Sequence, residues 1–281
     1  MNEQNQNQNK KTYRRVLTIA GSDSGGGAGI QADLKTFAAL RCYGMSVICA
    51  LTAQNTRGVT AIHSVPADFV GEQLDAVLSD IGVDAVKIGM LQSAEIIETV
   101  ADRLRRASVD SIVLDPVMIA KSGHKLLRSD AVEALKEHLL PLAALVTPNL
   151  PEAEVLTGMQ VRTRADMPAA VERLLAMGAG AALVKSGHLE GEAADDCLGG
   201  TAPDGSGYTH WFPAVRVDTP NTHGTGCTLS SAIAAFMAGG RDTRASVESA
   251  KMFITEALQA GAQYKIGAGH GPVHHFAGWW N

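Results

Sequence analysis

The amino-acid sequence predicts an α/β protein with one mostly parallel central sheet and helices on both of its faces. Short apolar segments alternate with segments of helical periodicity over nearly the whole chain, which is the pattern of a parallel sheet. No linker and no internal repeat interrupts this alternation. We therefore expect a polar, disordered tail over residues 1–15 and a single domain over residues 16–281.

The first half of the chain supplies five of the expected strands. Val16 to Ala20 is an apolar run that Gly21 ends, which is typical of a buried strand, and a glycine loop and a helix over 30–41 follow it. Residues 45–54 predict a second strand, with which 59–65 could pair. Apolar residues at helical spacing then predict helices over 70–81 and 96–104, each followed by a strand, at 85–89 and at 111–114.

The second half continues the same alternation. We expect helices over 129–140, from residue 151 and over 167–177, strands over 143–146 and 181–184, and weaker strands near 195–198 and 208–212. Apolar residues then recur at i, i+3, i+4, i+7 and i+8 over 228–238, which predicts an amphipathic helix that Gly239 and Gly240 end. A last helix is predicted from Thr243 to about Ala262.

Composition excludes several classes of protein. The net charge of -5 removes the positive charge that nucleic-acid binding usually needs, so we expect no nucleic-acid partner. No apolar run approaches the roughly 18 residues of a membrane helix, so we expect no membrane partner either. The four cysteines show no CxxC pairing and the N-terminus shows no apolar signal segment, which favours a reducing cytoplasmic location.

The segment from Thr222 to Cys227 is the strongest candidate for a reaction centre. Its glycines Gly224 and Gly226 let backbone N–H groups point at one spot, and together with Thr225 they precede a helix whose positive dipole end favours an anion. Cys227 lies at the same end, where the thiolate is favoured and the pKa is expected to fall. The segment could hold a transferring phosphoryl group, or it could be a glycine turn before a core helix, with Cys227 a small buried side chain.

The glycine loop from Gly21 to Gly29 invites a nucleotide-binding interpretation that two tests reject. It contains a match to G-x-G-x-x-A, but no acidic residue lies between Asp33 and Asp68 to bind a ribose. A phosphate loop of the Walker A type needs a Gly-Lys pair, and the chain has none. We expect a close-approach loop that does not bind a dinucleotide.

Polar residues follow several of the predicted strands, at the edge where such sheets bind ligands. Lys185 could reach a phosphate, and Asp115 and Glu152 are oxygen ligands of the kind Mg²⁺ prefers beside substrate phosphates. Asn149 lies next to them and could equally cap a helix. Helix capping and first-turn acids explain Asp115 and Glu152 as well, and a solvated lysine at a strand end explains Lys185.

Two further residues suit a small heterocycle such as an aminopyrimidine. The carboxylate of Asp33 accepts hydrogen bonds, and the amide of Gln54 both donates and accepts. The alternatives are a carboxylate that complements a helix dipole and a solvated loop tip. His274 and His275 resemble metal ligands, but adjacent histidines rarely face one ion, so we expect no metal there.

These segments together resemble the hydroxymethylpyrimidine/phosphomethylpyrimidine kinases of thiamine synthesis, members of the ribokinase-like superfamily. The resemblance extends from Val16 to Trp280 and is carried in order by residues 21–33, 53–56, 87–91, 114–118, 147–153, 185–188, 223–227 and 271–276. It implies phosphorylation of 4-amino-5-hydroxymethyl-2-methylpyrimidine by ATP and Mg²⁺, first to the monophosphate and then to the diphosphate. It also implies a ribokinase-like sheet with a small flap over the substrate site, and a homodimer.

The resemblance also assigns roles to residues. It implies that Gln54, Asp33, Met90 and Val117 bind the pyrimidine, and that Lys185 and Asn149 bind ATP or its phosphates. Asp115 and Glu152 resemble the metal set, and Gly224, Thr225 and Gly226 resemble the anion hole. Cys227 occupies the place of the catalytic base, which is Asp in most of the superfamily.

Two alternatives of different kinds stay open at this stage. A pyridoxal kinase would use the same anion loop with a cysteine. A non-catalytic pyrimidine-binding regulator would keep the fold, although the presence of Cys227, Lys185, Asp115 and Glu152 together speaks against it.

Overall fold

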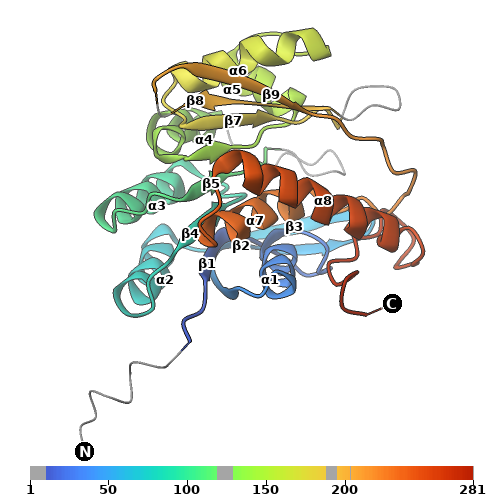
Figure 1. The fold of residues 1–281 in the computed structure, drawn as a ribbon. Helices are drawn as coiled ribbons and strands as arrows, with labels where there is room; N and C mark the ends of the chain where they lie inside the picture. Colours follow the sequence, from blue (N-terminus) through green and yellow to red (C-terminus); the bar gives the residue numbers. More distant parts are fainter. Residues whose placement is uncertain (1–10, 119–128, 188–194, 203, 281) are drawn as a thin grey trace, which may run out of the picture.

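A computed structural model describes residues 11–118, 129–187, 195–202 and 204–280 (Figure 1). Its strands are β1 (Arg15–Asp23), β2 (Tyr43–Asn55), β3 (Gly58–Ser64), β4 (Ala85–Ile88), β5 (Ile112–Leu114), β6 (Leu145–Val146), β7 (Ala181–Val184), β8 (Asp196–Thr201) and β9 (Gly207–Phe212). Its α-helices are α1 (Gly29–Ala39), α2 (Ala67–Asp80), α3 (Ala94–Arg106), α4 (Ser129–Ala134), α5 (Leu150–Thr157), α6 (Met167–Ala176), α7 (Thr225–Ala238) and α8 (Thr243–Gly261).

All these strands form one nine-stranded sheet in the order β3-β2-β1-β4-β5-β6-β7-β8-β9. The six central strands, β2, β1, β4, β5, β6 and β7, run parallel to one another. At the two edges β3 pairs antiparallel with β2, and β8 pairs antiparallel with β7 and β9. The mostly parallel sheet expected from the sequence is therefore confirmed. Because the chain leaves β1 first toward β2 and later toward β4, the direction of strand addition reverses beside β1, where sheets of this kind bind ligands.

The same reversal explains which helices cover which face. Right-handed crossovers place α1 on one face and the helices between β3 and β7 on the other. The buried cluster on the second face accordingly contains residues of α2, α3, α4, α5 and α6, whereas α1, α7 and α8 share the first face. In Figure 1 the red helices α7 and α8 lie in front of the central strands, where they complete the layer that α1 begins.

Helix α7 differs from the amphipathic helix predicted over 228–238. It begins at Thr225, directly after the glycine loop, and every residue from Thr228 to Ala235 is buried. The reason is its position, because α7 packs against α8 and α1 on one side and against β1, β4 and β5 on the other. Its small residues let it fit there, and its N-terminus points to the carboxyl edge of the sheet.

The predicted helix over 129–140 is also less regular than expected. It consists of α4, a π-helical turn at Leu135–Leu139 and a 3-10 turn at Leu140–Leu142, whose Pro141 cannot continue an α-helix. The predicted polar loop over 121–124 lies outside the described residues, as do residues 1–10 of the expected disordered tail.

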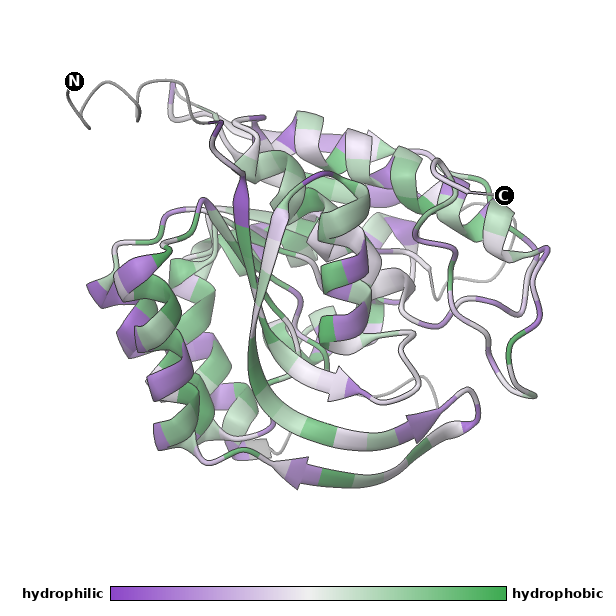
Figure 2. Ribbon diagram, turned by 90° about the horizontal axis from the view of Figure 1, so that it is seen from below, coloured by the Kyte–Doolittle hydropathy of each residue, from purple (hydrophilic) through white to green (hydrophobic). Residues whose placement is uncertain are grey.

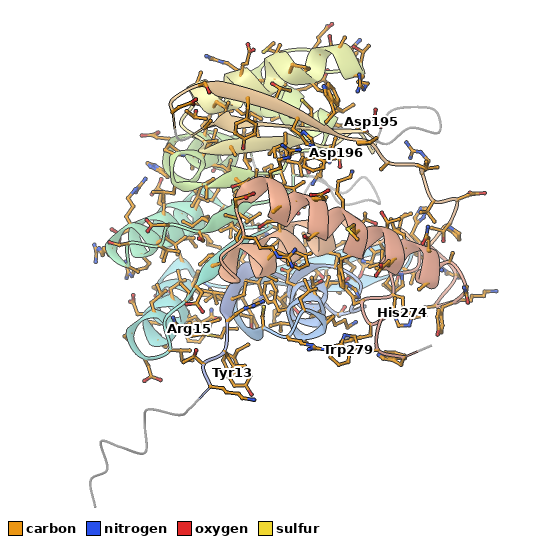
Figure 3. The ribbon with its side chains drawn as sticks, in the orientation of Figure 1. Tyr13, Arg15, Asp195, Asp196, His274 and Trp279 are labelled. Atoms are coloured by element: carbon orange, nitrogen blue, oxygen red, sulfur yellow. The ribbon has the colours of Figure 1, made fainter. Side chains whose placement is uncertain are left out.

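The β2–β3 hairpin extends past the helical layers as a curved two-stranded ribbon (Figure 2). Its end returns to the glycine loop, since Ser24 Oγ donates to the carbonyl of Gln54 at 2.9 Å. At the other terminus the chain folds back on α1, where the ring N–H of Trp279 donates to the carbonyl of Ala39 at 3.1 Å (Figure 3). No helix among the described residues is long and apolar enough to span a membrane.

Candidate active site

The polar residues predicted at the strand ends do gather at the carboxyl edge of the sheet. Asp115 follows β5 and Lys185 follows β7, and Lys185 Nζ donates to Asp115 Oδ1 at 3.0 Å. The N-terminal turn of α7 reaches the same place: a Cβ built on Gly226 would lie 3.7 Å from Lys185 Nζ and 3.8 Å from Asp115 Oδ2. The helix end, a lysine and a carboxylate thus surround one small space.

Asp115 is buried but firmly held in its ionised form. Its Oδ1 also accepts from Thr147 Oγ1 at 3.2 Å, and its Oδ2 accepts from Ser230 Oγ of α7 at 3.1 Å. Burial alone would raise the pKa of Asp115, but the charges of Lys185 and Lys87 hold that pKa below its usual range. Asp115 therefore links β5, β7 and α7 through one carboxylate.

Asn149 and Glu152 form a capping box at the start of α5. Asn149 Oδ1 accepts from the Glu152 N–H at 2.9 Å, and Glu152 Oε2 accepts from the Asn149 N–H at 2.8 Å. The capping alternative is therefore confirmed, and the roles in metal and phosphate binding stay predictions, although charges on Lys185 and Asp115 act on the Glu152 carboxyl. Burial raises the pKa of Glu152 to about 7 against the lowering effect of Lys185, with Asp115 adding to the rise.

The anion loop has the backbone geometry expected of it. Gly224 has φ +80° and caps α7, and the Thr225 hydroxyl closes the turn on the carbonyl of Thr222 at 2.8 Å. The N–H groups of Gly226 and Cys227 are the second and third of the helix, where no partner exists within the helix itself. They are available to an anion in front of Lys185.

The two glycine loops interlock, which the sequence did not reveal. A Cβ on Gly224 would overlap the carbonyl oxygen of Gly27, and a Cβ on Gly27 would overlap the ring of His223. Asp23 fastens the contact: its Oδ1 accepts from the N–H of Gly25, and its Oδ2 accepts from the N–H groups of Gly27 and Ala28 and lies 2.8 Å from His223 Nε2. Although burial raises the pKa of Asp23, these bonds bring it below its usual range.

Asp23 and His223 are functional candidates that the sequence analysis missed. An aspartate three residues after an apolar run and a histidine before the anion loop were the available signals, but only the fold shows that they meet. Gln54 completes this contact, with its Nε2 3.4 Å from His223 Nε2 and its Oε1 accepting from Thr52 Oγ1 at 3.0 Å. Gln54 is half-buried, so its amide is accessible beside the anion loop.

Cys227 departs from one expectation. We expected the helix end to lower the pKa of its thiol, but burial raises that pKa to about 11, although the charge of Lys87 and the N–H of Gly29 favour the thiolate. Desolvation outweighs the helix end, although Cys227 is only half-buried. Cys227 is therefore a thiol, not a thiolate, at neutral pH in the unliganded protein.

Asp33 also departs from its expected place. It is fully buried, and its carboxylate accepts from Thr18 Oγ1 at 2.6 Å, from Ser231 Oγ at 2.7 Å and from Lys87 Nζ at 3.0 Å. The Asp33 carboxylate thus already accepts four hydrogen bonds and forms an ion pair with Lys87, and its role as a pyrimidine ligand stays a prediction. The signal for Lys87 was a charged residue within an otherwise apolar strand.

The two predicted apolar wall residues lie at different depths. Met90 follows β4 and is buried, and its Cε would be 2.5 Å from a Cβ on Gly21, so the glycine leaves room for the methionine. Val117 is half-buried and lies two residues after Asp115.

The adjacent histidines at the C-terminus have separate environments. His275 is buried with its Nε2 3.0 Å from Thr228 Oγ1, and burial lowers its pKa to about 3. His274 packs its ring against Tyr264 and Trp280. Within the described ranges no group of three His, Cys, Asp or Glu residues is arranged around a metal position.

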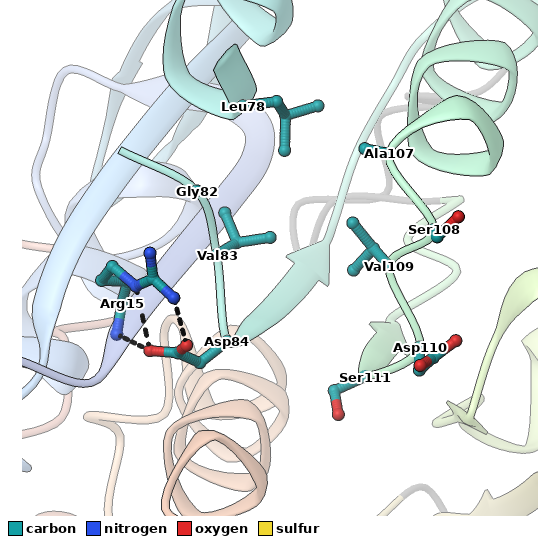
Figure 4. A pocket seen from close by; sticks show the side chains of 10 residues that line it. All are labelled: Arg15, Leu78, Gly82, Val83, Asp84, Ala107, Ser108, Val109, Asp110 and Ser111. Carbon is teal, nitrogen blue, oxygen red and sulfur yellow. Dashed lines mark hydrogen bonds and ion pairs between the residues drawn. The ribbon is translucent and has the colours of Figure 1, made fainter. Parts of the chain in front are cut away.

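A separate pocket of about 360 Å³ lies at the opposite edge, where β1, β4 and β5 begin (Figure 4). Arg15 and Asp84 form an ion pair at 2.6 Å on its wall. The pocket contains none of the residues predicted to act, and parallel sheets bind their ligands at the other edge. The cluster around Gly226 remains the candidate active site.

Comparison with known proteins identifies the family. The family model described as phosphomethylpyrimidine kinase matches residues 23–274. The chain belongs to this family. A hydroxymethylpyrimidine/phosphomethylpyrimidine kinase from Rhizobium meliloti (strain 1021) is 54% identical over 266 residues, which are 94% of this chain and 98% of the relative.

Solved structures confirm the ribokinase-like α/β fold for this family member. A phosphomethylpyrimidine kinase from Clostridium difficile 630 matches with a TM-score of 0.77 and 45% identity, over 87% of this chain and 99% of that one. A Bacillus subtilis pyridoxal kinase in complex with ADP matches with a TM-score of 0.86 and 37% identity, over 96% of this chain and all of that one.

Proposed function

We propose that the protein phosphorylates 4-amino-5-hydroxymethyl-2-methylpyrimidine with ATP, first to the monophosphate and then to the diphosphate, in thiamine biosynthesis. The observation that carries this proposal is the convergence of the bare α7 N-terminus at Gly226 with Lys185 and Asp115 in a chain of the phosphomethylpyrimidine kinase family. Phosphoryl transfer needs mainly positioning and charge, and this cluster supplies both.

ATP is the proposed donor because a structurally similar pyridoxal kinase was solved with ADP. In this chain Lys185 and Asn149 are the proposed phosphate ligands. Lys185 keeps its positive charge despite burial, since Asp115 and Glu152 raise its pKa. A charged amine beside the N–H groups of Gly226 and Cys227 would draw phosphoryl oxygens to the helix end.

Mg²⁺ is proposed to bind at Asp115 and Glu152. Two carboxylates that interact with each other and face a phosphate position fit an ion that prefers one or two carboxylates, water and substrate phosphates. The bound ion would neutralise charge on the transferring phosphates. Glu152 must lose its proton to bind it, which its pKa of about 7 permits near neutral pH.

The proposed acceptor is the pyrimidine hydroxymethyl group in front of Gly224, Thr225 and Gly226. Its oxygen forms the new bond to phosphorus as the bond to ADP breaks, and its proton leaves to a base or to solvent. The thiol of Cys227 is neutral at pH 7, and a neutral thiol does not accept a proton, so we propose that Cys227 acts as the base only from its minor thiolate fraction, or else serves as part of the anion site while the proton leaves to solvent.

Gln54, Met90 and Val117 are the proposed contacts of the pyrimidine ring. Gln54 offers both a donor and an acceptor and lies against His223, next to the anion loop. We do not include Asp33 among these contacts because its carboxylate oxygens already accept hydrogen bonds from Thr18, Lys87 and Ser231.

A side-by-side turnover assay with the hydroxymethylpyrimidine and with pyridoxal tests the proposal. We expect the pyrimidine alcohol to be phosphorylated with the higher kcat/KM. A higher value for pyridoxal would favour pyridoxal kinase activity, and no phosphorylation of either alcohol would favour a pyrimidine-binding regulator.

We also propose a homodimer that works in the cytoplasm. The dimer rests on the family resemblance, and light scattering of the eluted protein tests it. The compartment rests on the pattern of the four cysteines, all of which are free thiols that a reducing compartment would preserve.

A further inference from the structure

Lys87 is a charged residue in the interior of the sheet that the proposed mechanism does not use. It lies within β4, between Val86 and Ile88, and its side chain is completely buried. Its Nζ donates to both carboxylate oxygens of Asp33 at 3.0 Å. Burial by itself would lower the pKa of Lys87, but Asp33 outweighs it, so the amine is charged.

The Asp33 carboxylate joins four elements of the fold. Thr18 belongs to β1, Asp33 to α1, Lys87 to β4 and Ser231 to α7, and all three partners donate to that carboxylate. Ser231 lies four residues after Cys227, on the same side of α7 and one turn below it. The cluster therefore fixes the helix turn that carries the thiol and the anion loop.

Stability does not explain why charges occupy this position. A buried ion pair must desolvate two charges, and apolar side chains of similar volume often hold the same elements equally well. What an apolar pair could not supply is a fixed charge bonded through Asp33 to Ser231, one turn of α7 from Cys227.

The charged groups that act on Cys227 belong to three parts of the fold: β4, α1 and the segment after β5. Lys87 on β4 favours the thiolate, whereas Asp33 on α1 and Asp115 after β5 oppose it, and the backbone N–H of Gly29 favours it. Of these charges, that of Lys87 acts most strongly on the thiol.

We propose that Lys87 is a positioning residue: Asp33 holds its amine in place and joins this positive charge to Ser231, one turn of α7 from Cys227 and the anion loop. The part of this proposal that concerns phosphoryl transfer rests on the proposed kinase function. Its effect on the thiol does not depend on that function.

The direct test measures the alkylation rate of Cys227 by iodoacetamide against pH, with the site identified by mass spectrometry. The double variant Lys87→Met/Asp33→Asn removes both charges and leaves no unpaired buried ion. We expect a rate about three to ten times lower at a pH below the thiol pKa, which corresponds to a shift of about half a unit to one unit. An unchanged profile would overturn the proposal.

A matched control removes a second ion pair, at the opposite edge of the sheet where β1 and β4 begin. Arg15→Met/Asp84→Asn removes the ion pair that joins the starts of β1 and β4 at the opposite edge. We expect its alkylation profile to match that of the wild type. A decrease equal to that of the Lys87 variant would mean that the loss of any ion pair beside β4 alters the thiol, and would also overturn the proposal.

A second variant keeps the test decisive if the double variant does not fold. Asp33→Asn alone removes a charge that opposes the thiolate, while Asp115 continues to hold Lys87 in its charged form. We expect faster alkylation at the same pH. An equal or slower rate would contradict the assignment.

Steady-state turnover of the first double variant is the last measurement of the test. In the Lys87→Met/Asp33→Asn variant we expect kcat to fall about tenfold with the KM values for ATP and alcohol unchanged, because the charge acts on the transfer and touches neither substrate. A rise in KM with kcat unchanged would contradict it. If the wild type phosphorylates neither alcohol, the proposed function fails, and the alkylation arm still decides the role of Lys87.

Discussion

Two glycines of the anion loop, Gly224 and Gly226, should respond in opposite ways to replacement by alanine. Gly224 has φ +80°, and a Cβ there would overlap the carbonyl oxygen of Gly27. Gly226 lies inside α7, where a Cβ would meet only Lys185 Nζ at 3.7 Å and Asp115 Oδ2 at 3.8 Å. The first glycine is required by the backbone, whereas the second leaves space for a ligand.

The magnitudes follow from these surroundings. In Gly224→Ala the left-handed backbone costs about 1–2 kcal/mol, and moving a backbone carbonyl adds about 1–3 kcal/mol. We therefore expect the free energy of unfolding to fall by roughly 2–5 kcal/mol. In Gly226→Ala we expect it to stay equal or rise by up to about 1 kcal/mol, since alanine favours a helix. Its methyl group would nevertheless fill the phosphoryl position and lower kcat about 100-fold or more.

Denaturant unfolding and steady-state turnover of both variants measure these quantities. A Gly224→Ala protein as stable as the wild type would refute the interlock of the two glycine loops. A Gly226→Ala protein with wild-type kcat would show that no phosphoryl group occupies the space before Lys185.

Three further predictions concern charged and polar groups of the site. Because the pKa of Glu152 is raised from 4.5 to about 7, the metal-free protein should lose up to about 3 kcal/mol of stability as pH rises through this range. Mg²⁺ affinity should rise over the same pH range. Glu152→Gln should flatten the pH dependence of both the stability, measured by denaturant unfolding, and the Mg²⁺ affinity, measured by calorimetric titration. Cys227→Ala should lower kcat while pyrimidine binding persists, and unchanged turnover would remove the thiol from the mechanism. Lys185→Ala should impair ATP use about 100-fold in kcat/KM, and wild-type kinetics with ATP would contradict its assignment.

Much of the fold could be predicted because the apolar periodicity along the chain is strong. The strands from β1 to β7 and the helices between them follow directly from it. The prediction of helix α7 was less accurate because periodicity cannot show that a helix will be covered on all sides. Its burial depends on α1 and α8, which meet it only in the folded protein.

The site was predicted best where residues act at strand ends. Asp115 and Lys185 meet because parallel strands bring their carboxyl ends to one edge, which the sequence pattern already implies. The side-chain partners of Asp33, Lys87 and His223 could not be predicted, since they are distant in the chain. The prediction that the pKa of Cys227 falls was wrong because the helix end is visible in the sequence, whereas the desolvation of the thiol is not.

Mass spectrometry of the products formed from ATP, Mg²⁺ and the hydroxymethylpyrimidine tests the central claim most directly. The proposed function predicts the mass of the monophosphate first and that of the diphosphate after longer incubation, with neither formed by the Gly226→Ala variant. An unmodified pyrimidine in the presence of folded wild-type protein would contradict it.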